Sequence, residues 1–151
     1  MIEFTTNNPD KSKQYTKRNG AYAVIKNNDD LIAIIKTKKG YFLPGGGVEA
    51  GETLEMCLRR ECLEEIGAEI LELNKYSCGN HYLYSTTLNI HMENIGHFFT
   101  CKIDRFLEIE TEEDHELVWL SHEQANELLY LPNQKEAVRI IKDKRQVNKQ
   151  K

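Results

Sequence analysis

Three glutamates in the middle of the chain have a spacing that brings carboxylates together. Glu61, Glu64 and Glu65 stand at positions i, i+3 and i+4, so on a helix their side chains leave from neighbouring turns. Like charges this close repel, and a half-buried carboxylate is costly without a cation beside it. Mg²⁺ fits best, since proteins hold it with one or two carboxylates together with substrate phosphates. The spacing therefore predicts a metal site suited to phosphate chemistry.

The helix that positions these acids is predicted over residues 53–66, with Gly67 as its C-terminal stop. At about 100° per residue, its apolar positions form one stripe. These positions are Leu54, Leu58, Cys62 and Ile66. Glu65 falls inside the stripe and Glu61 beside it, whereas a helix with a merely solvated acidic face would carry its acids on the opposite side. We therefore expect at least one acid to be partly buried.

A run of glycines precedes the helix. Gly45-Gly46-Gly47 allows unusual backbone angles and lets main-chain groups approach a ligand or a metal closely. Alone, such a run is equally typical of a turn. Glu52 follows at the junction of loop and helix, and Arg60 could neutralise or orient a neighbouring acid. Together with the acids at fixed spacing, the loop becomes strong evidence for a site.

The loop and the helix together resemble the signature of the Nudix family, G-x5-E-x7-R-E-U-x-E-E-x-G-U, in which U is a bulky aliphatic residue. The matching residues are Gly46, Glu52, Arg60, Glu61, Glu64, Glu65 and Gly67. Val48 and the preceding Pro44-Gly45 also look like the family, whereas Cys62 and Ala68 depart from it as smaller apolar residues at the two U positions. A chance match of this length is on the order of one in a hundred thousand or rarer.

The resemblance implies Mg²⁺-dependent hydrolysis of a phosphoanhydride bond in a nucleoside diphosphate linked to another moiety, such as a nucleoside triphosphate. Mn²⁺ could replace Mg²⁺. Two other substrate classes stay open, the dinucleoside polyphosphates and the ADP-ribose or nucleotide-sugar diphosphates. A more distant alternative is a nucleotide-sensing domain that kept the fold and lost turnover, against which the intact box acids argue.

The same resemblance assigns roles to the residues of the box, which spans residues 46–68. Glu64 and Glu65 are implied as the main metal ligands, with the carbonyl of Gly45 as another. Glu61 is either a ligand or the general base. The implied catalytic residues are Glu52, which orients, Arg60, which pairs with a glutamate, Glu61 and Glu64.

A second acidic segment follows the strands of the chain's later half. It contains Glu112, Glu113, Asp114 and Glu116, and it precedes a predicted strand at residues 116–120. Some relatives supply an extra carboxylate here, and we favour Glu116 or Glu113 for that role. The alternative is a solvated acidic turn. The neighbouring histidines, His115 and His122, are interpreted as surface residues and given no role.

The substrate is encoded less clearly than the chemistry. Tyr82 and Tyr84 resemble a tyrosine that some dinucleoside-polyphosphate hydrolases carry after the box, although strand aromatics are more often part of a core. Arg18 could contact phosphates or simply be a charge at a strand edge. We predict that all three residues, Arg18, Tyr82 and Tyr84, bind the substrate.

An α/β fold follows from strands that are interrupted by one helix and closed by further helices. The resemblance implies an α/β/α sandwich, a mixed sheet with the box helix and the C-terminal helices packed on it. We expect residues 21–25 and 31–35 to form a β-hairpin, and Asn94-Ile95-Gly96 to break the later strands. Ser121 is predicted to cap a helix to about Leu129, and Pro132 to begin a last one.

The organisation of the chain is predicted to be simple. Residues 1–17 are expected to be a polar lead-in, and residues 18–147 a single domain, with a basic tail over residues 142–151. The length of 151 residues suits one domain with a sizeable core.

Composition narrows the function and the location. A net charge of -4 disfavours a general nucleic-acid binder and leaves a small-molecule nucleotide as the expected partner. The four cysteines form no C-x-x-C pair and are expected to be reduced. There is no apolar run of membrane-spanning length and no basic, apolar leader, so we expect a cytoplasmic protein. The sequence does not distinguish a monomer from a homodimer.

Overall fold

Two β-sheets and three helices make up the fold of the computed structural model, which describes residues 1–150 and the side chains of residues 1–142. One sheet has five strands in the order β1-β6-β7-β2-β5, and the other has three in the order β4-β3-β8. The elements are β1 (Ile2–Thr5), β2 (Thr16–Ile25), β3 (Ile32–Thr37), β4 (Gly40–Phe42), β5 (Gly45–Gly47), α1 (Leu54–Ile66), β6 (Ala68–Ser85), β7 (Ile90–Phe106), β8 (Glu116–Leu120), α2 (His122–Leu128) and α3 (Pro132–Gln150).

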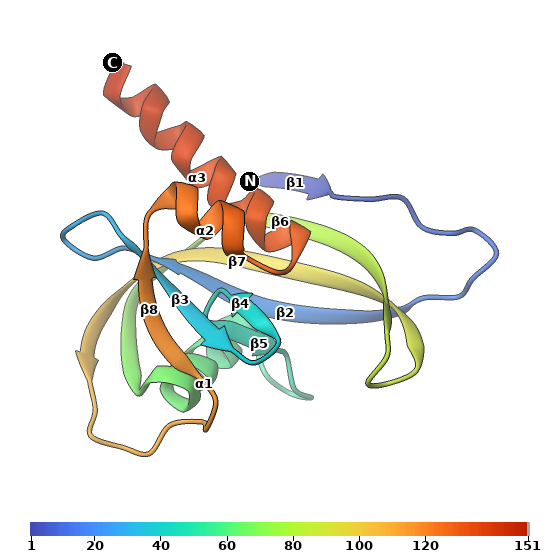
Figure 1. Cartoon of the computed structure of the whole chain (residues 1–151), viewed down its shortest axis with the longest axis horizontal. Helices are drawn as coiled ribbons and strands as arrows, with labels where there is room; N and C mark the ends of the chain where they lie inside the picture. The colour runs from blue at the N-terminus through green and yellow to red at the C-terminus, as the bar shows by residue number, and fades with distance from the viewer. Residues whose placement is uncertain (151) are drawn as a thin grey trace.

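The helices cover opposite sides of the strands, with α1 on one side and α2 and α3 on the other (Figure 1). Alternating side chains of β2 and β3 pack into two separate hydrophobic cores, because successive residues of a strand point to opposite faces. Ala23 and Ala33 pack toward α1, whereas Val24, Ile32 and Ile34 pack toward α2 and α3. This arrangement confirms the predicted α/β/α sandwich with a mixed sheet.

The helix α1 ends where the sequence predicts and begins one residue later, at Leu54. Thr53 is its N-cap, and the Thr53 hydroxyl accepts a hydrogen bond of 3.1 Å from the backbone N–H of Met56. Gly67 ends the helix in the left-handed conformation, with φ of 66°. Only glycine adopts this conformation without steric cost, so the stop is encoded in one residue.

Replacing Thr53 with Ala should lower the free energy of unfolding by about 1 kcal/mol, since the N-cap acceptor is lost. Urea denaturation followed by circular dichroism measures this difference. Thr53→Ser keeps the hydroxyl and should stay close to the wild type. Equal stability of the Ala and Ser variants would contradict the capping role.

The predicted hairpin of residues 21–25 and 31–35 is wrong. β2 pairs with β5 and β7, whereas β3 pairs with β4 and β8, and the two strands share only an isolated bridge between Lys26 and Ile32 within the described chain. Both strands are apolar on both faces, so each is central in a sheet of its own. The polar link between them carries the chain from one sheet to the other.

The predicted break at Asn94-Ile95-Gly96 is also wrong. These residues lie inside β7, paired in parallel with β2 and antiparallel with β6. Gly96 is needed for packing, because a Cβ there would stand 2.6 Å from the ring of Phe98. The actual turn lies between β6 and β7 and contains Asn89 with φ of 55°.

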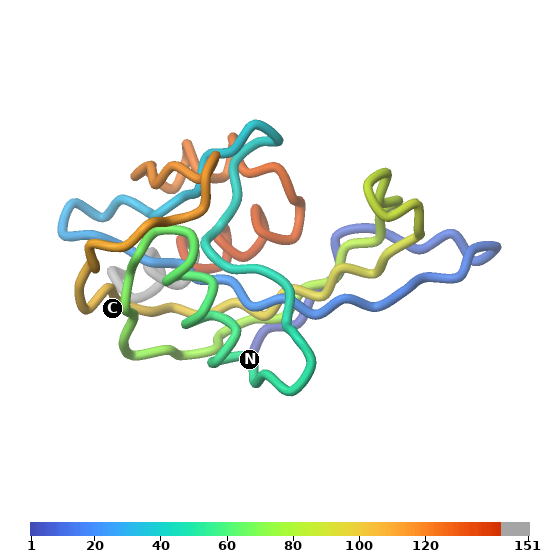
Figure 2. Tube along the Cα trace, turned by 90° about the horizontal axis from the view of Figure 1, so that it is seen from below, coloured from blue at the N-terminus to red at the C-terminus, as the bar shows by residue number. Residues whose placement is uncertain are grey.

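The first residues contribute more than a lead-in. β1 pairs in parallel with β6, and β2 already begins at Thr16. The ends of β6 and β7 and the segment before β2 project together from the helix-covered body (Figure 2). The predicted domain limits at residues 18 and 147 stay a prediction. The predicted basic tail lies mostly outside the described side chains. Of the described helices, none combines the length and the apolar character needed to cross a bilayer.

Candidate active site

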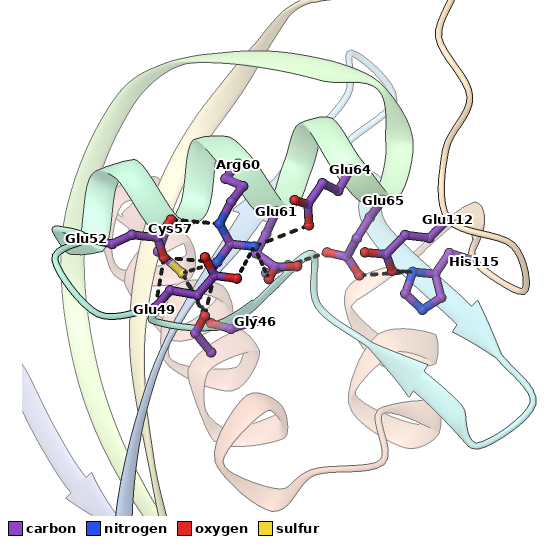
Figure 3. Close-up of polar contacts among 12 residues, drawn as sticks. Gly46, Glu49, Glu52, Cys57, Arg60, Glu61, Glu64, Glu65, Glu112 and His115 are labelled. Atoms are coloured by element: carbon purple, nitrogen blue, oxygen red, sulfur yellow. Dashed lines mark hydrogen bonds and ion pairs between the residues drawn. The ribbon is translucent and has the colours of Figure 1, made fainter.

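Helix α1 presents its acids toward β5 and the loop before β8, as Figure 3 shows. Glu65 is buried, with 6% of its surface exposed, although it is a carboxylate. The side chain of Glu61 is 16% exposed and that of Glu64 is 46% exposed. The order of burial agrees with the helical wheel, which placed Glu65 in the apolar stripe and Glu61 beside it.

Arg60 contacts three of the box acids. Its guanidinium forms a fork on Glu52, with Nε 2.7 Å from Oε2 and Nη2 3.0 Å from Oε1. Its Nη1 donates to Glu61 at 2.9 Å and to Glu64 at 3.2 Å. The hydrogen bond with Arg60 lowers the pKa of Glu52 to about 2, and the Glu52 contact raises the pKa of Arg60 above its ordinary value. Glu52 therefore orients Arg60, and Arg60 orients Glu61.

The buried carboxyl of Glu65 has one hydrogen bond from the backbone. The N–H of Gly45 donates to its Oε1 at 2.8 Å. Burial raises the pKa of Glu65 to about 8, and the charges of Glu61, Glu112 and Glu64 add to this effect against the Gly45 hydrogen bond. Burial likewise raises the pKa of Glu61. Both acids would ionise fully beside a cation, so the donor set fits a divalent metal.

The glycine run is a short strand and not a free loop. Gly45–Gly47 forms β5, which pairs antiparallel with residues 20–22 of β2. Gly45 has φ of 140°, and a Cβ there would lie 2.1 Å from the carbonyl oxygen of Ala21. A Cβ on Gly46 would lie 2.6 Å from the carboxyl carbon of Glu61. Glycine is thus required for the backbone to lie directly against the acids.

Sequence reasoning missed Glu112 and His115. Nδ1 of His115 lies 2.6 Å from Oε2 of Glu112 and 3.5 Å from Oε2 of Glu65. Two groups of residues each bring three potential ligand atoms within 4.8 Å of one another. One group is Glu65, Glu112 and His115, and the other is Glu61, Glu64 and Glu112. A metal-binding cluster of box and loop residues is therefore available.

The two carboxylates favoured from the sequence are not the ones brought to the cluster. Neither Glu113 nor Glu116 belongs to these groups of described ligands, and Glu116 instead lines a neighbouring cavity with Lys36 and Lys38. The difference arises because the backbone N–H of Glu112 bonds to the carbonyl of Glu64 at 2.9 Å. The only sequence signal was the presence of acids and a histidine in one segment, which does not select among them.

A cavity of about 540 Å³ opens beside the cluster. Its volume lies in the usual range of small-ligand sites, roughly 300–1,000 Å³. The lining residues are Arg18, Tyr22, Ile35, Thr37, Lys38, Lys39, Phe42, Leu43, Gly45, Gly46, Gly47, Glu65, Asn94, Asp114, His115, Leu131 and Gln134. The cavity therefore joins the buried acid to cationic, aromatic and amide groups.

Of the three residues predicted to bind substrate, only Arg18 lines this cavity. Tyr82 packs edge-on against Tyr15 at a ring distance of 5.0 Å, and Tyr84 packs against His91. Both tyrosines lie near the turn between β6 and β7, in the projecting part of the strands. Their positions do not support the role in substrate binding that their place in the sequence suggested.

In the absence of metal, stability should depend on pH through Glu65. Its pKa in the folded state, about 8, lies above the ordinary value of 4.5, so the native state is penalised once this group must ionise. The free energy of unfolding in EDTA should therefore fall as the pH rises from about 5 to about 8, and Mg²⁺ should restore it. The charged or titratable neighbours facing Glu65 are Glu61, Glu64, Glu112 and His115.

Urea denaturation at several pH values measures this dependence. Glu65→Gln keeps the shape and the acceptor oxygen for Gly45 but has no carboxyl to ionise. Its stability in EDTA should decline less steeply over the same interval. Identical pH profiles for the wild type and the variant would contradict the assignment of this dependence to Glu65.

The α/β/α sandwich thus packs a glutamate-rich helix against a short strand of three glycines. The model of the NUDIX domain family matches residues 16–143, which is most of the chain. The chain belongs to the Nudix family.

Similar proteins agree with this membership. NAD-capped RNA hydrolase NudC of Pseudomonas aeruginosa is 30% identical over 90 residues, covering 55% of this chain and 32% of NudC. Nucleoside triphosphatase NudI of Escherichia coli is 42% identical over 60 residues, covering 36% of this chain and 37% of NudI. The chain thus spans about a third of the length of these curated relatives.

Solved structures show the same fold. A NUDIX hydrolase from Nitrosomonas europaea superposes with a TM-score of 0.68 at 16% identity, covering 82% of this chain and 87% of that one. A MutT NUDIX hydrolase from Burkholderia pseudomallei gives 0.64 at 22% identity, with 82% and 97% covered. The dihydroneopterin triphosphate pyrophosphohydrolase of E. coli gives 0.63 at 18% identity, with 83% and 95% covered.

Proposed function

We propose that this protein is a Mg²⁺-dependent hydrolase that cuts a phosphoanhydride bond in a nucleoside diphosphate linked to another moiety, such as a nucleoside triphosphate. The observation that carries the proposal is the buried carboxyl of Glu65, which lies among further acids and faces the 540 Å³ cavity. A divalent cation offsets this concentration of charge and at the same time attracts a phosphate chain.

Several residues in and beside the box are candidate ligands of the metal. Glu61, Glu64 and Glu65 would be its carboxylate ligands, with the carbonyl of Gly45 as a further candidate. A bound divalent metal neutralises phosphate oxygens and makes a bound water more acidic. Glu61 is either a ligand or the proton acceptor, and its half-buried carboxyl with a raised pKa suits the latter role.

The fork between Glu52 and Arg60 has a positioning role in this proposal. Arg60 is bonded to Glu52 through Nε and Nη2, so only its Nη1 is directed at Glu61 and Glu64. In this proposal the guanidinium therefore binds the box acids and does not contact the substrate. By limiting the motion of Glu61, the fork keeps one carboxyl oxygen at the cluster.

The cavity supports a nucleotide as the substrate. Arg18, Lys38 and Lys39 supply positive charge for phosphates, and Tyr22 and Phe42 supply aromatic surface for a base. The sequence favoured Tyr82 and Tyr84 as the aromatic residues that bind substrate, whereas the cavity favours Tyr22 and Phe42. Local cations of this kind explain how a protein with a net charge of -4 can attract an anionic substrate.

A buried amide forms part of the lining of the same cavity. The side chain of Gln134 is fully buried, and its Oε1 accepts the backbone N–H of Leu43 at 2.8 Å. Its Nε2 has no hydrogen-bond partner among the described side chains. The bond to Leu43 fixes the orientation of the amide and ties the backbone at the cavity to α3.

The names of the similar proteins support the class of substrate and leave its identity open. NudI is named a nucleoside triphosphatase and NudC an NAD-capped RNA hydrolase, so both act on phosphate-linked nucleotides. We propose a small nucleotide for this chain, consistent with its acidic net charge. A cytoplasmic location stays a prediction from the sequence.

A nucleotide panel tests the proposal. It contains nucleoside triphosphates, a dinucleoside polyphosphate, ADP-ribose, a nucleotide sugar and a nicotinamide dinucleotide, each incubated with Mg²⁺ and, separately, with EDTA. We expect release of a nucleoside monophosphate from at least one compound with Mg²⁺ and none with EDTA. Protein carrying Glu65→Gln and purified in the same way controls for contaminating phosphatases. Turnover that chelation leaves unchanged would contradict the metal mechanism.

A further inference from the structure

We infer that His115 is a nitrogen ligand of the divalent-metal site, so that the site favours metals with affinity for imidazole more than an all-oxygen site would. The inference rests on the proposed function, because it requires a metal among the acids of α1. Figure 3 shows His115 and Glu112 reaching the cluster from the loop before β8, opposite Glu65 on α1. The residues thus approach one point from two elements.

The distances suit a shared cation. Nδ1 of His115 lies 2.6 Å from Oε2 of Glu112 and 3.5 Å from Oε2 of Glu65. Bonds of about 2.1 Å to a metal place neighbouring ligand atoms roughly 3.0–3.4 Å apart in octahedral and tetrahedral sites. The two observed distances lie on either side of this range, so small side-chain rotations bring all three ligand atoms around one ion.

The imidazole nitrogen is not used by a hydrogen bond. Nδ1 of His115 is hidden from solvent and has no partner in hydrogen-bond geometry among residues 1–142, although Glu112 is close. A buried polar atom in this condition costs free energy unless a ligand supplies the missing interaction. A metal ion between His115 and the buried Glu65 would supply this interaction to His115 and offset the charge of Glu65.

The loop that carries His115 is fixed to the box helix. The N–H of Glu112 donates to the carbonyl of Glu64 at 2.9 Å, and the N–H of His115 donates to the carbonyl of Glu112 at 3.3 Å. Between them, Asp114 has φ of 70°, and its Oδ2 accepts the N–H of Lys38 at 3.3 Å. These bonds hold the imidazole over the carboxylates independently of any metal.

A nitrogen ligand changes the order of metal affinity. Carboxylates and carbonyls suit Mg²⁺, whereas imidazole favours later first-row metals, whose affinity rises from Mn²⁺ to Co²⁺. Loss of one ligand or of its support costs about 10–100-fold in the affinity of a metal site. We therefore expect His115→Gln to weaken Co²⁺ binding by about 10–100-fold and Mg²⁺ binding by less than about threefold, because Mg²⁺ readily keeps water in place of a protein ligand.

Electron spin-echo spectroscopy of the full chain loaded with Mn²⁺ alone tests the inference. The wild type should show coupling of Mn²⁺ to a ¹⁴N nucleus, and protein grown with ¹⁵N-histidine should show a changed pattern without any substitution. His115→Gln should lose the nitrogen coupling. His91→Gln is the matched control, since His91 packs against Tyr15 and Tyr84 outside the metal-ligand groups.

The outcomes separate this inference from the proposed function. Mn²⁺ that binds without nitrogen coupling would overturn the role of His115 and leave the hydrolase proposal intact. Nitrogen coupling that persists in His115→Gln, or that ¹⁵N-histidine leaves unchanged, would also overturn that role. A wild type that binds no Mn²⁺ would overturn both proposals.

Discussion

Glu65→Gln should lower kcat by about 10²–10⁴-fold, because charge stabilisation by a bound metal is worth several kcal/mol in the transition state. The substitution removes the negative charge and keeps the volume and the oxygen that accepts the 2.8 Å hydrogen bond from Gly45. The folded protein should therefore be retained. In EDTA near pH 8 it should be at least as stable as the wild type, since it no longer ionises a buried group whose pKa is about 8.

Steady-state kinetics on the nucleotide identified by the panel, with urea denaturation of the same preparation, measures both effects. Glu55→Gln is the matched control, because Glu55 stands on the outward side of α1 and pairs with Arg59 at 3.0 Å. That variant should keep kcat within about twofold. A Glu65→Gln enzyme with wild-type kcat would show that Glu65 does not hold the catalytic metal.

Gly45→Ala should be the most damaging substitution outside the acids, lowering the free energy of unfolding by about 3–5 kcal/mol. The new Cβ would stand 2.1 Å from the carbonyl oxygen of Ala21, which is backbone and cannot turn aside. The φ of 140° adds strain for any residue with a side chain. Moving β5 away from β2 would also remove the hydrogen bond from Gly45 to Glu65.

Thermal and urea unfolding, together with Mg²⁺ titration by calorimetry, follow the consequences of Gly45→Ala. Gly51→Ala is the matched control, since Gly51 has φ of 82° but no atom within 4 Å of an added Cβ. It should lose only about 1–2 kcal/mol, from backbone conformation alone. Equal losses for the two variants would show that the close approach of β5 to β2 contributes nothing.

The part of the site encoded by local sequence was predicted. The start of α1 within one residue of Thr53, its stop at Gly67 and the burial of Glu65 all follow from local end signals and the period of 3.6 residues. The cap of α2 at Ser121 was predicted for the same reason, and the structure confirms it. Features that depend on a few neighbouring residues are readable because their hydrogen bonds and packing form within one or two turns.

The part that depends on distant segments was not predicted. The selection of Glu112 over Glu113 and Glu116 is set by its hydrogen bond to the carbonyl of Glu64, 48 positions earlier in the chain, and carbonyl groups are the same in every residue. The apolar runs of β2 and β3 identified strands but not their partners. Such pairing is decided by which edges and faces must be buried in the folded molecule.

The role of glycine shows a similar limit. Gly45 and Gly96 were interpreted as a loop and a break because glycine is common in turns. In the fold, both lie within strands where a side chain would collide with Ala21 or Phe98. A sequence reports that a side chain is absent, whereas only the packing shows whether the reason is a turn or a close approach.

The most direct measurement is an anomalous difference map from a crystal soaked with Mn²⁺ and a non-hydrolysable nucleotide. A peak should appear among the carboxylates of Glu61, Glu64 and Glu65, with the phosphate chain beside it. The same three side chains pointing into solvent, with the nucleotide bound and no metal peak between them, would contradict the proposed chemistry.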